Sequence, residues 1–286
     1  MVDWRNGGKG LTNWSGSCMI FVCLYEVNNT KNPSKKGMET DMSERKQAPE
    51  TPWYLRPFGP LVSLALLCVV WGVYGKARLS GRRTRAQRAW QVVSQGCVYD
   101  LGRDLTRHNC FRYCNRGSLS SAYFAQATAA LSDGYIYLAL THSNSPAGEV
   151  IGLFTGRAYN HISLAFDRAL KTLVSYNGGE GREAPGLNPE TLKGLAERKG
   201  ASVRVYRLAA TRHQKQIMLK RLRKINQEGS AYNLLGLLFP MSCQPNIMFC
   251  SQFVYAMLRL AGLHYFRKNP LQVRPTDFVE WDRRRR

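Results

Sequence analysis

Acidic side chains are scarce in this chain of 286 residues: 19 Asp and Glu stand against 41 Lys and Arg, a formal net charge of +22. So large a positive charge predicts affinity for surfaces that carry phosphate, either nucleic acid or anionic lipid. Charge as a whole is nevertheless modest, at 21% of residues, while 44% are hydrophobic. This balance excludes disorder throughout the chain and leaves room for one or two folded domains.

Cysteine is sparse as well, with eight residues and no CxxC pair. This usage excludes a small scaffold held by disulfides and indicates mostly reduced thiols, available for packing, metal binding or catalysis. His108, Cys110 and Cys114 form one loose cluster, but zinc sites use four ligands and no fourth ligand is evident. We therefore expect no metal and no cofactor.

Repeats and nucleic-acid signatures are missing too: the chain has no internal repeat and no RNP, KH or helix-turn-helix motif. Basic side chains gather in the expected helix 211–226 and in the tail 283–286, with few aromatic residues between them. A stacking groove for single strands needs such aromatic residues. Nucleic acid is accordingly an improbable partner, and an anionic membrane surface is the expected one.

Long apolar runs are rare, and one stands out: the seventeen residues 58–74 carry no charge and lie between Arg56 and Lys76. With aromatic residues near its edges, this run is typical of a short transmembrane helix with a basic flank over 53–78. A buried core helix and a cleaved signal peptide are the alternatives. The cations that follow the run place the C-terminal part in the cytoplasm of a single-pass membrane protein.

The rest of the chain falls into three regions that differ in composition and in hydrophobic periodicity. Residues 1–52 are expected to be a disordered polar tail, and residues 79–130 a helical juxtamembrane region. Residues 131–286 predict an α+β domain with an antiparallel sheet. Strands are expected at 135–141, 161–166, 172–176 and 201–208, and helices at 149–154, 188–199, 211–226, 232–239 and 250–261.

One cysteine of this domain is placed for chemistry. Cys250 opens the last helix, directly after a segment rich in helix breakers. The free N–H groups and the positive end of a helix stabilise a thiolate there, and the N–H of Cys250 itself can serve an oxyanion hole. A small buried cysteine without chemistry is the alternative.

A histidine could supply the base. His161 begins a strand on which His161, Ser163 and Ala165 share one face. These small neighbours would let the helix of Cys250 approach the imidazole. A third group should orient the ring, and the returning strand offers Ser175 or Asn177.

Four segments together resemble a known family: TGRAYNHISLAFD, SAYNLLGLL, MFCSQFVYAMLRLAG and RPTDF. They are similar to the permuted papain-like cysteine hydrolases of the NlpC type, in particular the YiiX-like amidase and peptidase branch. This branch is related to the lecithin retinol acyltransferase-like enzymes. In the permuted order the His strand precedes the Cys helix, as it does here across about residues 133–280. Gln252 departs from the Glu that the branch often carries, and Asn177 from its Gly.

The resemblance implies that Cys250 is the nucleophile and His161 the general base of an acyl transfer to water or another acceptor, with no metal. The expected protein is a membrane-anchored cysteine hydrolase acting on an amide or ester, in a peptide or a lipid. Two alternatives stay open: an inactive papain-like fold that binds a membrane or ligand, and a lipid acyltransferase or thioesterase.

Overall fold

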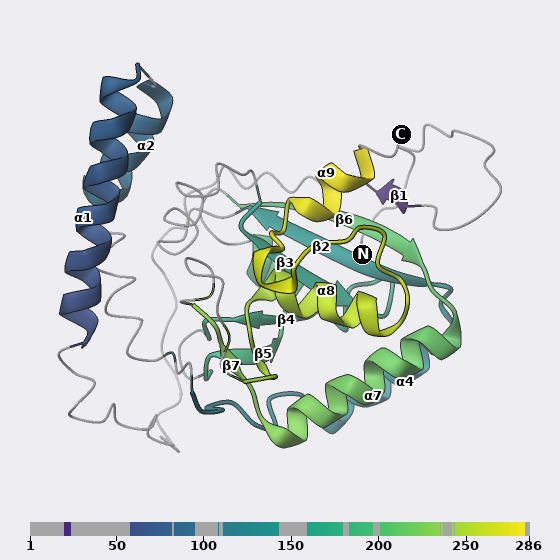
Figure 1. Cartoon of the computed structure of the whole chain (residues 1–286). Coiled ribbons are helices and arrows are strands. Elements are labelled where there is room, and N and C mark those ends of the chain that lie inside the picture. The colour runs from purple at the N-terminus through teal and green to yellow at the C-terminus, as the bar shows by residue number, and fades with distance from the viewer. Residues whose placement is uncertain are drawn as a thin grey trace, which may run out of the picture.

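The computed structural model describes residues 20–23, 58–81, 83–94, 108, 111–142, 159–179, 183–196, 201–234, 236, 242 and 244–283. At its centre lies an antiparallel sheet with the strand order β1-β6-β2-β3-β4-β5 (Figure 1). The strands are β1 (Ile20–Cys23), β2 (Tyr135–His142), β3 (His161–Ala165), β4 (Val174–Asn177), β5 (Gly186–Pro189) and β6 (Ser202–Ala209). The predicted α+β class with an antiparallel sheet is confirmed.

The helices follow in chain order around this sheet. They are α1 (Phe58–Leu79), α2 (Arg83–Ser94), α4 (Ser121–Ala129), α6 (Leu192–Ala196), α7 (Arg212–Glu228), α8 (Cys250–Leu260) and α9 (Asp277–Arg283). Two single turns of 3-10 helix, η3 (Ala130–Ser132) and η5 (Pro270–Gln272), complete the set. A separate parallel pair, β7 (Ala231–Tyr232) and β8 (Ile247–Met248), leads into α8.

Alternation along the strands divides the sheet into two faces. Ile162 and Leu164 of β3 belong to the main core, which also contains the apolar side of α8, whereas Ala165 packs into a smaller cluster with Val203 and Val205. Successive side chains of a strand point to opposite faces, so this division follows directly from the sequence pattern. Helix α8 packs on β3 and β4 (Figure 1).

Helix boundaries in the C-terminal half follow local capping. Thr211 accepts a hydrogen bond from the N–H of Gln214 at 3.2 Å, and the Gln214 side chain accepts one from the N–H of Thr211 at 2.9 Å. This reciprocal pair starts α7 at the predicted place. Gly262, with a φ of 69°, follows the end of α8, where the left-handed region favours glycine.

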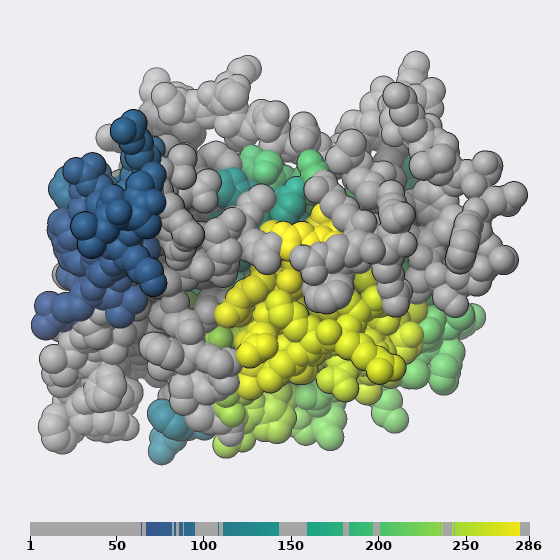
Figure 2. Space-filling view, turned by 45° about the horizontal axis from the view of Figure 1, so that its top comes forward, coloured from purple at the N-terminus to yellow at the C-terminus, as the bar shows by residue number. Residues whose placement is uncertain are grey.

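The C-terminal residues fold back over the outside of α8. The Tyr255 hydroxyl donates to the carbonyl oxygen of Phe266 at 3.0 Å, and the Ser251 hydroxyl donates to that of Val273 at 2.7 Å. In Figure 2 these last segments, drawn in yellow, form a continuous part of the surface. The segment that follows α8, which contains Phe266 and Val273, therefore holds the first turns of this helix on the side away from the sheet.

The predicted helix over 188–199 is wrong at its start. Residues Gly186–Pro189 form β5 instead, which pairs with β4, and of the predicted residues that the structure describes, Leu192–Ala196 are helical. The Asn-Pro pair resembles a helix start, but β5 is the last strand of the sheet, and an edge strand tolerates a residue that has no N–H. Glu190 thereby comes to lie just beyond the end of an edge strand.

The folded unit extends to the N-terminal side of the predicted domain boundary at residue 131. Asn115 and Ser230 form a backbone bridge, and helix α4 buries Tyr123 and Ala127 in the main core. The segment 111–130 is therefore packed with the sheet. Of residues 1–52, the structure describes only β1, which pairs with β6. The helix expected at 149–154 lies outside the described residues, and Tyr232, expected in a helix, lies in β7.

Helix α1 forms where the uncharged run predicted a helix, and α2 lies beside it (Figure 1). Aromatic rings join the two: Trp71 lies 5.4 Å from Tyr74 and 6.0 Å from Trp90 between ring centroids. Val70 of α1 and Ala89 of α2 are fully buried. Part of the apolar surface of α1 is thus used to pack α2.

Among the described residues, no helix is both long enough and apolar enough to cross a membrane. The prediction of a transmembrane helix over 53–78 is therefore not supported in this part of the chain.

Candidate active site

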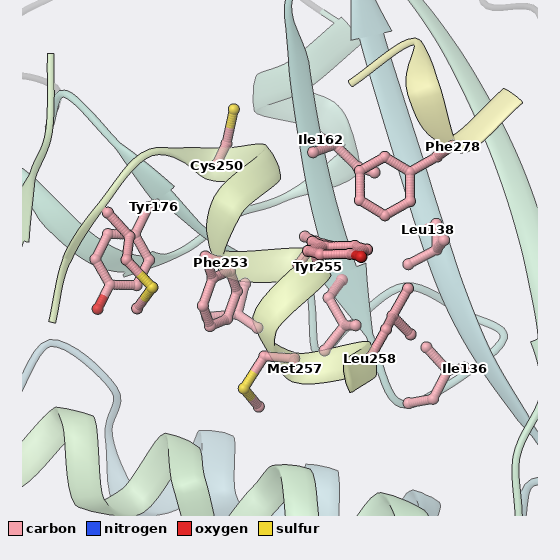
Figure 3. Packing of buried hydrophobic residues seen from close by; sticks show 14 of the residues in the cluster. Ile136, Leu138, Ile162, Tyr176, Cys250, Phe253, Tyr255, Met257, Leu258 and Phe278 are labelled. Atoms are coloured by element: carbon pink, nitrogen blue, oxygen red, sulfur yellow. The ribbon is translucent and has the colours of Figure 1, made fainter. Parts of the chain in front are cut away.

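Cys250 is the first residue of α8, and its side chain is 1% exposed. The preceding residue, Phe249, has an extended backbone and accepts the first intrahelical hydrogen bond, from the N–H of Phe253 at 3.0 Å. The N–H groups of the first turn have no carbonyl partner within the helix. Figure 3 shows the sulfur pointing away from Phe253 and Tyr255, which the same helix buries. The sulfur and these N–H groups therefore meet at one end of α8.

His161 is the first residue of β3, and its ring is held by a carboxylate. The Nε2 atom lies 2.9 Å from Oε1 and 3.1 Å from Oε2 of Glu190. Both side chains are largely buried, with 11% of His161 and 5% of Glu190 exposed. Because the carboxylate occupies Nε2, the other ring nitrogen, Nδ1, is left to face a reaction partner.

A network of polar side chains holds Glu190 from behind. Ser163 donates a short hydrogen bond to Oε2, and the Asn177 amide donates to Oε1 at 2.9 Å. Asn188 donates to Asn177 at 2.8 Å, and Asn115 donates to Asn188 at 2.8 Å. Side chains of β3, β4 and β5, together with Asn115 from far earlier in the chain, thus form one network around this carboxylate. Buried polar groups bonded in this way are held in one arrangement.

The two ionisable groups stabilise each other's charged form. Burial opposes the charge of His161, but the Glu190 carboxylate and the contact with Cys250 outweigh it and raise the pKa of the imidazole to about 10. Burial also opposes the charge of Glu190, but His161, Asn177 and Ser163 lower its pKa to about 2. At neutral pH the pair is an imidazolium and a carboxylate.

The thiol adjoins this pair. A hydrogen bond with Cys250 and electrostatic attraction to it both help to raise the pKa of His161. Tyr232 of β7 is buried near the same sulfur, and burial together with Cys250 and Glu190 raises its pKa well above the usual range. The phenol therefore keeps its proton and is a hydrogen-bond donor. A thiol, an imidazolium and a neutral phenol therefore influence one another electrostatically at this end of α8.

The side of β3 that α8 covers differs from the expected one. The main core joins α8 to Ile162, Leu164 and Phe166, and not to the small residues on the face of His161. Large apolar side chains gain more from burial against a helix than Ser or Ala do. Cys250 and His161 meet because each is the first residue of its element.

Neither predicted third group binds the imidazole directly. Ser175 is fully buried and donates to the carbonyl oxygen of Ile162 at 2.7 Å, so it ties β4 to β3. Asn177 binds the Glu190 carboxylate, which in turn binds the imidazole. The residue that the sequence reading missed is Glu190. If residues 186–190 (GLNPE) had been predicted as a strand, Asn188 and Glu190 would have been placed on the same face of it, because every second side chain of a strand shares a face.

A metal centre has no candidate ligand set in the described part of the chain: no three His, Cys, Asp or Glu residues there are grouped to hold an ion. In the loose cluster, Cys114 donates from its sulfur to the carbonyl oxygen of Pro185 at 3.2 Å, and Cys110 lies outside the described residues.

Comparison of the chain with protein-family models, with curated proteins and with solved structures finds no match.

Proposed function

We propose that residues 111–283 form a cysteine hydrolase that transfers an acyl group through Cys250, with the permuted papain-like arrangement of the NlpC type. One observation carries the proposal: His161 lies between the Glu190 carboxylate, 2.9 Å from Nε2, and the Cys250 thiol at the start of α8. A nucleophile, a base and a group that orients the base are the minimum set for covalent catalysis. The substrate is an amide or ester in a peptide or a lipid.

The charges define the order of events. Cys250 gives its proton to His161, and the Glu190 carboxylate on Nε2 stabilises the resulting imidazolium. The thiolate attacks the carbonyl carbon, and the oxygen that gains charge is held by N–H groups of the first turn of α8 and by the Tyr232 hydroxyl. His161 then gives its proton to the leaving group. In the second step His161 takes a proton from water, and the water oxygen attacks the acyl carbon and breaks its bond to the sulfur.

Alkylation of Cys250 tests the proposal without a known substrate. In the full-length protein, iodoacetamide is added between pH 5 and 9, and modification at each cysteine is followed by peptide mass. An ordinary thiol is only about 1% thiolate at pH 6.5. The rate at Cys250, relative to its own plateau, is expected to stay flat down to about pH 6, whereas the rate of a small-molecule thiol, glutathione, in the same buffer falls roughly tenfold per pH unit.

Substitution of the base gives the matched result. In His161→Ala the fall of the Cys250 rate at low pH should follow that of glutathione, a loss of roughly fifty-fold or more at pH 6.5 relative to wild type. Ser175→Ala, on the neighbouring strand and without contact to the ring, should keep the wild-type profile. A wild-type Cys250 whose rate depends on pH as that of glutathione does would favour the alternative in which this fold binds a ligand without chemistry.

The acceptor is a separate question. Release of product from a lipid ester in the presence of an amine distinguishes an acyltransferase from a thioesterase or amidase, because only the first attaches the acyl group to the amine.

Attachment to an anionic membrane, with the hydrolase unit in the cytoplasm, stays a prediction from the cations that follow residue 74. Binding of the full chain to vesicles of anionic lipid at low salt, with release at high salt, would support it; no binding at low salt would contradict it. Neither result bears on the alkylation experiment.

A further inference from the structure

A cavity lies between α1 and α2, near the tight turn that joins the two helices. The helices run side by side, and Gly81 of the turn has a φ of 69° (Figure 1). The volume of the cavity is about 640 Å³, and its lining includes Tyr74, Arg78, Arg83 and Trp90. Sites that bind small molecules have volumes of about 300–1,000 Å³. The space is therefore large enough for a ligand that the proposed hydrolase chemistry does not use.

The cavity carries positive charge. Arg78 of α1 and Arg83 of α2 both line it, and both side chains are exposed. The sequence has no Asp or Glu between Glu50 and Asp100, so neither helix offers a carboxylate to these guanidinium groups. Within the described part of the chain, the ion pairs include neither arginine. The two cations are therefore available to an anionic ligand.

A phosphate group suits two such cations better than a carboxylate does. The N–H groups of a guanidinium form a planar fork that binds two phosphate oxygens at once. A phosphomonoester carries a charge of about −1.5 to −2 at neutral pH. The two positive charges of Arg78 and Arg83 match this charge, whereas a carboxylate or a phosphodiester carries a single negative charge.

The surroundings of the cavity are apolar and favour a lipid as the source of the phosphate. Leu79, next to Arg78, is 93% exposed. Trp90 is 53% exposed, and Trp71, whose ring centroid lies 6.0 Å from that of Trp90, is 45% exposed. The described parts of both helices, drawn in blue in Figure 2, lie at the surface. A lipid layer would bury these side chains, and tryptophan is enriched at the boundary between headgroups and acyl chains. A soluble phosphate would leave them in water.

We infer that the cavity between α1 and α2 binds the phosphomonoester of an anionic lipid headgroup. Arg78 and Arg83 bind the phosphate oxygens, and the apolar side chains beside the cavity contact the lipid. The inference rests on the attachment to an anionic membrane proposed above and names its site, but it does not depend on the chemistry of Cys250.

Vesicle flotation of the full-length protein at about 0.15 M salt tests the site. The double variant Arg78→Gln, Arg83→Gln should bind vesicles of phosphatidylcholine and phosphatidic acid roughly thirtyfold more weakly than wild type, because each cation near an anionic surface contributes about fivefold. Wild type should prefer phosphatidic acid, a phosphomonoester, to phosphatidylglycerol, a phosphodiester, in vesicles adjusted to the same surface charge. Equal affinity for the two lipids would contradict the inference.

Helix α7 supplies a matched control, since Arg212 and Lys220 are both exposed there and neither lines the cavity. The double variant Arg212→Gln, Lys220→Gln lowers the net charge by the same amount and should change the affinity by less than about threefold. Thermal unfolding verifies that each variant is folded. An equal loss in the two double variants would mean that diffuse charge attracts the membrane, and would overturn the role of the cavity.

A lipid and a soluble phosphate are distinguished by Leu79. Leu79→Ser keeps both arginines and should weaken vesicle binding about tenfold, because an apolar side chain is no longer buried in the lipid. Inorganic phosphate supplies the opposite case. A wild-type protein that is stabilised against heat by phosphate more than by chloride at equal ionic strength, but does not bind vesicles with phosphatidic acid, would assign the cavity to a soluble phosphate and overturn the lipid.

The outcomes separate this inference from the earlier proposals. Vesicle binding that is unchanged in Arg78→Gln, Arg83→Gln overturns the cavity and leaves membrane attachment in place. A wild-type protein that does not bind anionic vesicles even at low salt contradicts both. None of these results changes the expected alkylation of Cys250, which depends on His161.

Discussion

Two buried cationic side chains of this protein, Lys215 and His161, are bound by different kinds of group. Lys215 of α7 is fully buried, and its Nζ atom lies 2.6 to 2.9 Å from four backbone carbonyl oxygens, those of Ala130, Asp133, Tyr135 and Phe166. His161 is bound by side chains, the Glu190 carboxylate on one edge of its ring and the Cys250 thiol beside it.

The difference separates a structural charge from a chemical one. Backbone carbonyls neither titrate nor leave their elements, so these contacts of Lys215 join α7 to the ends of η3, β2 and β3. Burial lowers the pKa of Lys215 to about 8, which still leaves it protonated at neutral pH. The partners of His161 can exchange protons with it. A buried charge next to another titratable group is the one to examine for function.

The largest effect on folding should come from Lys215. Lys215→Met removes the ammonium from four carbonyl oxygens and should lower the free energy of unfolding by about 3 kcal/mol or more. Denaturant unfolding measures the loss. Lys224→Met is the control on the same helix: the Lys224 side chain is 63% exposed and its Nζ lies 3.5 Å from Glu228, so its loss should change stability by less than about 0.5 kcal/mol. Equal effects of the two variants would remove the distinction between the buried and the exposed cation.

Glu190→Gln should act on the chemistry more than on the fold. The amide can still bond to His161 but cannot balance its charge, so the imidazolium and with it the thiolate of Cys250 become less favourable. The rate of Cys250 alkylation at pH 6 should fall roughly tenfold or more, with the acid limb at higher pH. A profile identical to wild type would show that the carboxylate is only structural.

The pair should also leave a signature in the pH dependence of stability. The pKa of His161 is raised from 6.5 to about 10, so its contribution is complete below pH 6.5 and is lost as pH rises through about 10. The pKa of Glu190 is lowered from 4.5 to about 2, so its contribution is complete above pH 4.5 and is lost as pH falls through about 2. The stability difference between wild type and the double variant His161→Gln, Glu190→Gln should therefore be largest between pH 4.5 and 6.5. Thermal midpoints across pH 2 to 10 measure it, and a difference that does not vary with pH would contradict the pairing.

The smallest effect is expected at Asn177. Asn177→Ala removes one hydrogen bond to Glu190, worth about 1 kcal/mol, while His161 and Ser163 still hold the carboxylate. Alkylation of Cys250 at pH 6 should slow by only about threefold. A loss as large as that of Glu190→Gln would mean that Asn177 matters for the imidazole as much as the carboxylate does.

Local rules predicted several elements well. The capping pair Thr211 and Gln214 marks the start of α7, and alternation marks β3 with His161 at its beginning. The start of α8 at Cys250 was also predicted, because the breaker-rich segment before it cannot continue a helix. These features depend on neighbours in the chain, and the sequence displays them directly.

Glu190 could not be found by the same rules. An Asn-Pro pair satisfies both a helix start and an edge strand, and only the pairing of β5 with β4 chooses between them. The N-terminal limit of the unit was missed for a similar reason. Asn115 looks like a loop residue until its amide contacts Asn188, far along the chain.

By itself, the sequence determined the positive charge, the class of fold, and the two residues at which β3 and α8 begin, since composition, periodicity and capping are local properties. Only the tertiary structure decided that Glu190 binds His161, that Ser251 at the start of α8 binds Val273, and that Lys215 is bound by carbonyl oxygens. Each of these contacts joins segments that the chain separates, and their energies depend on which segments the packed core brings together.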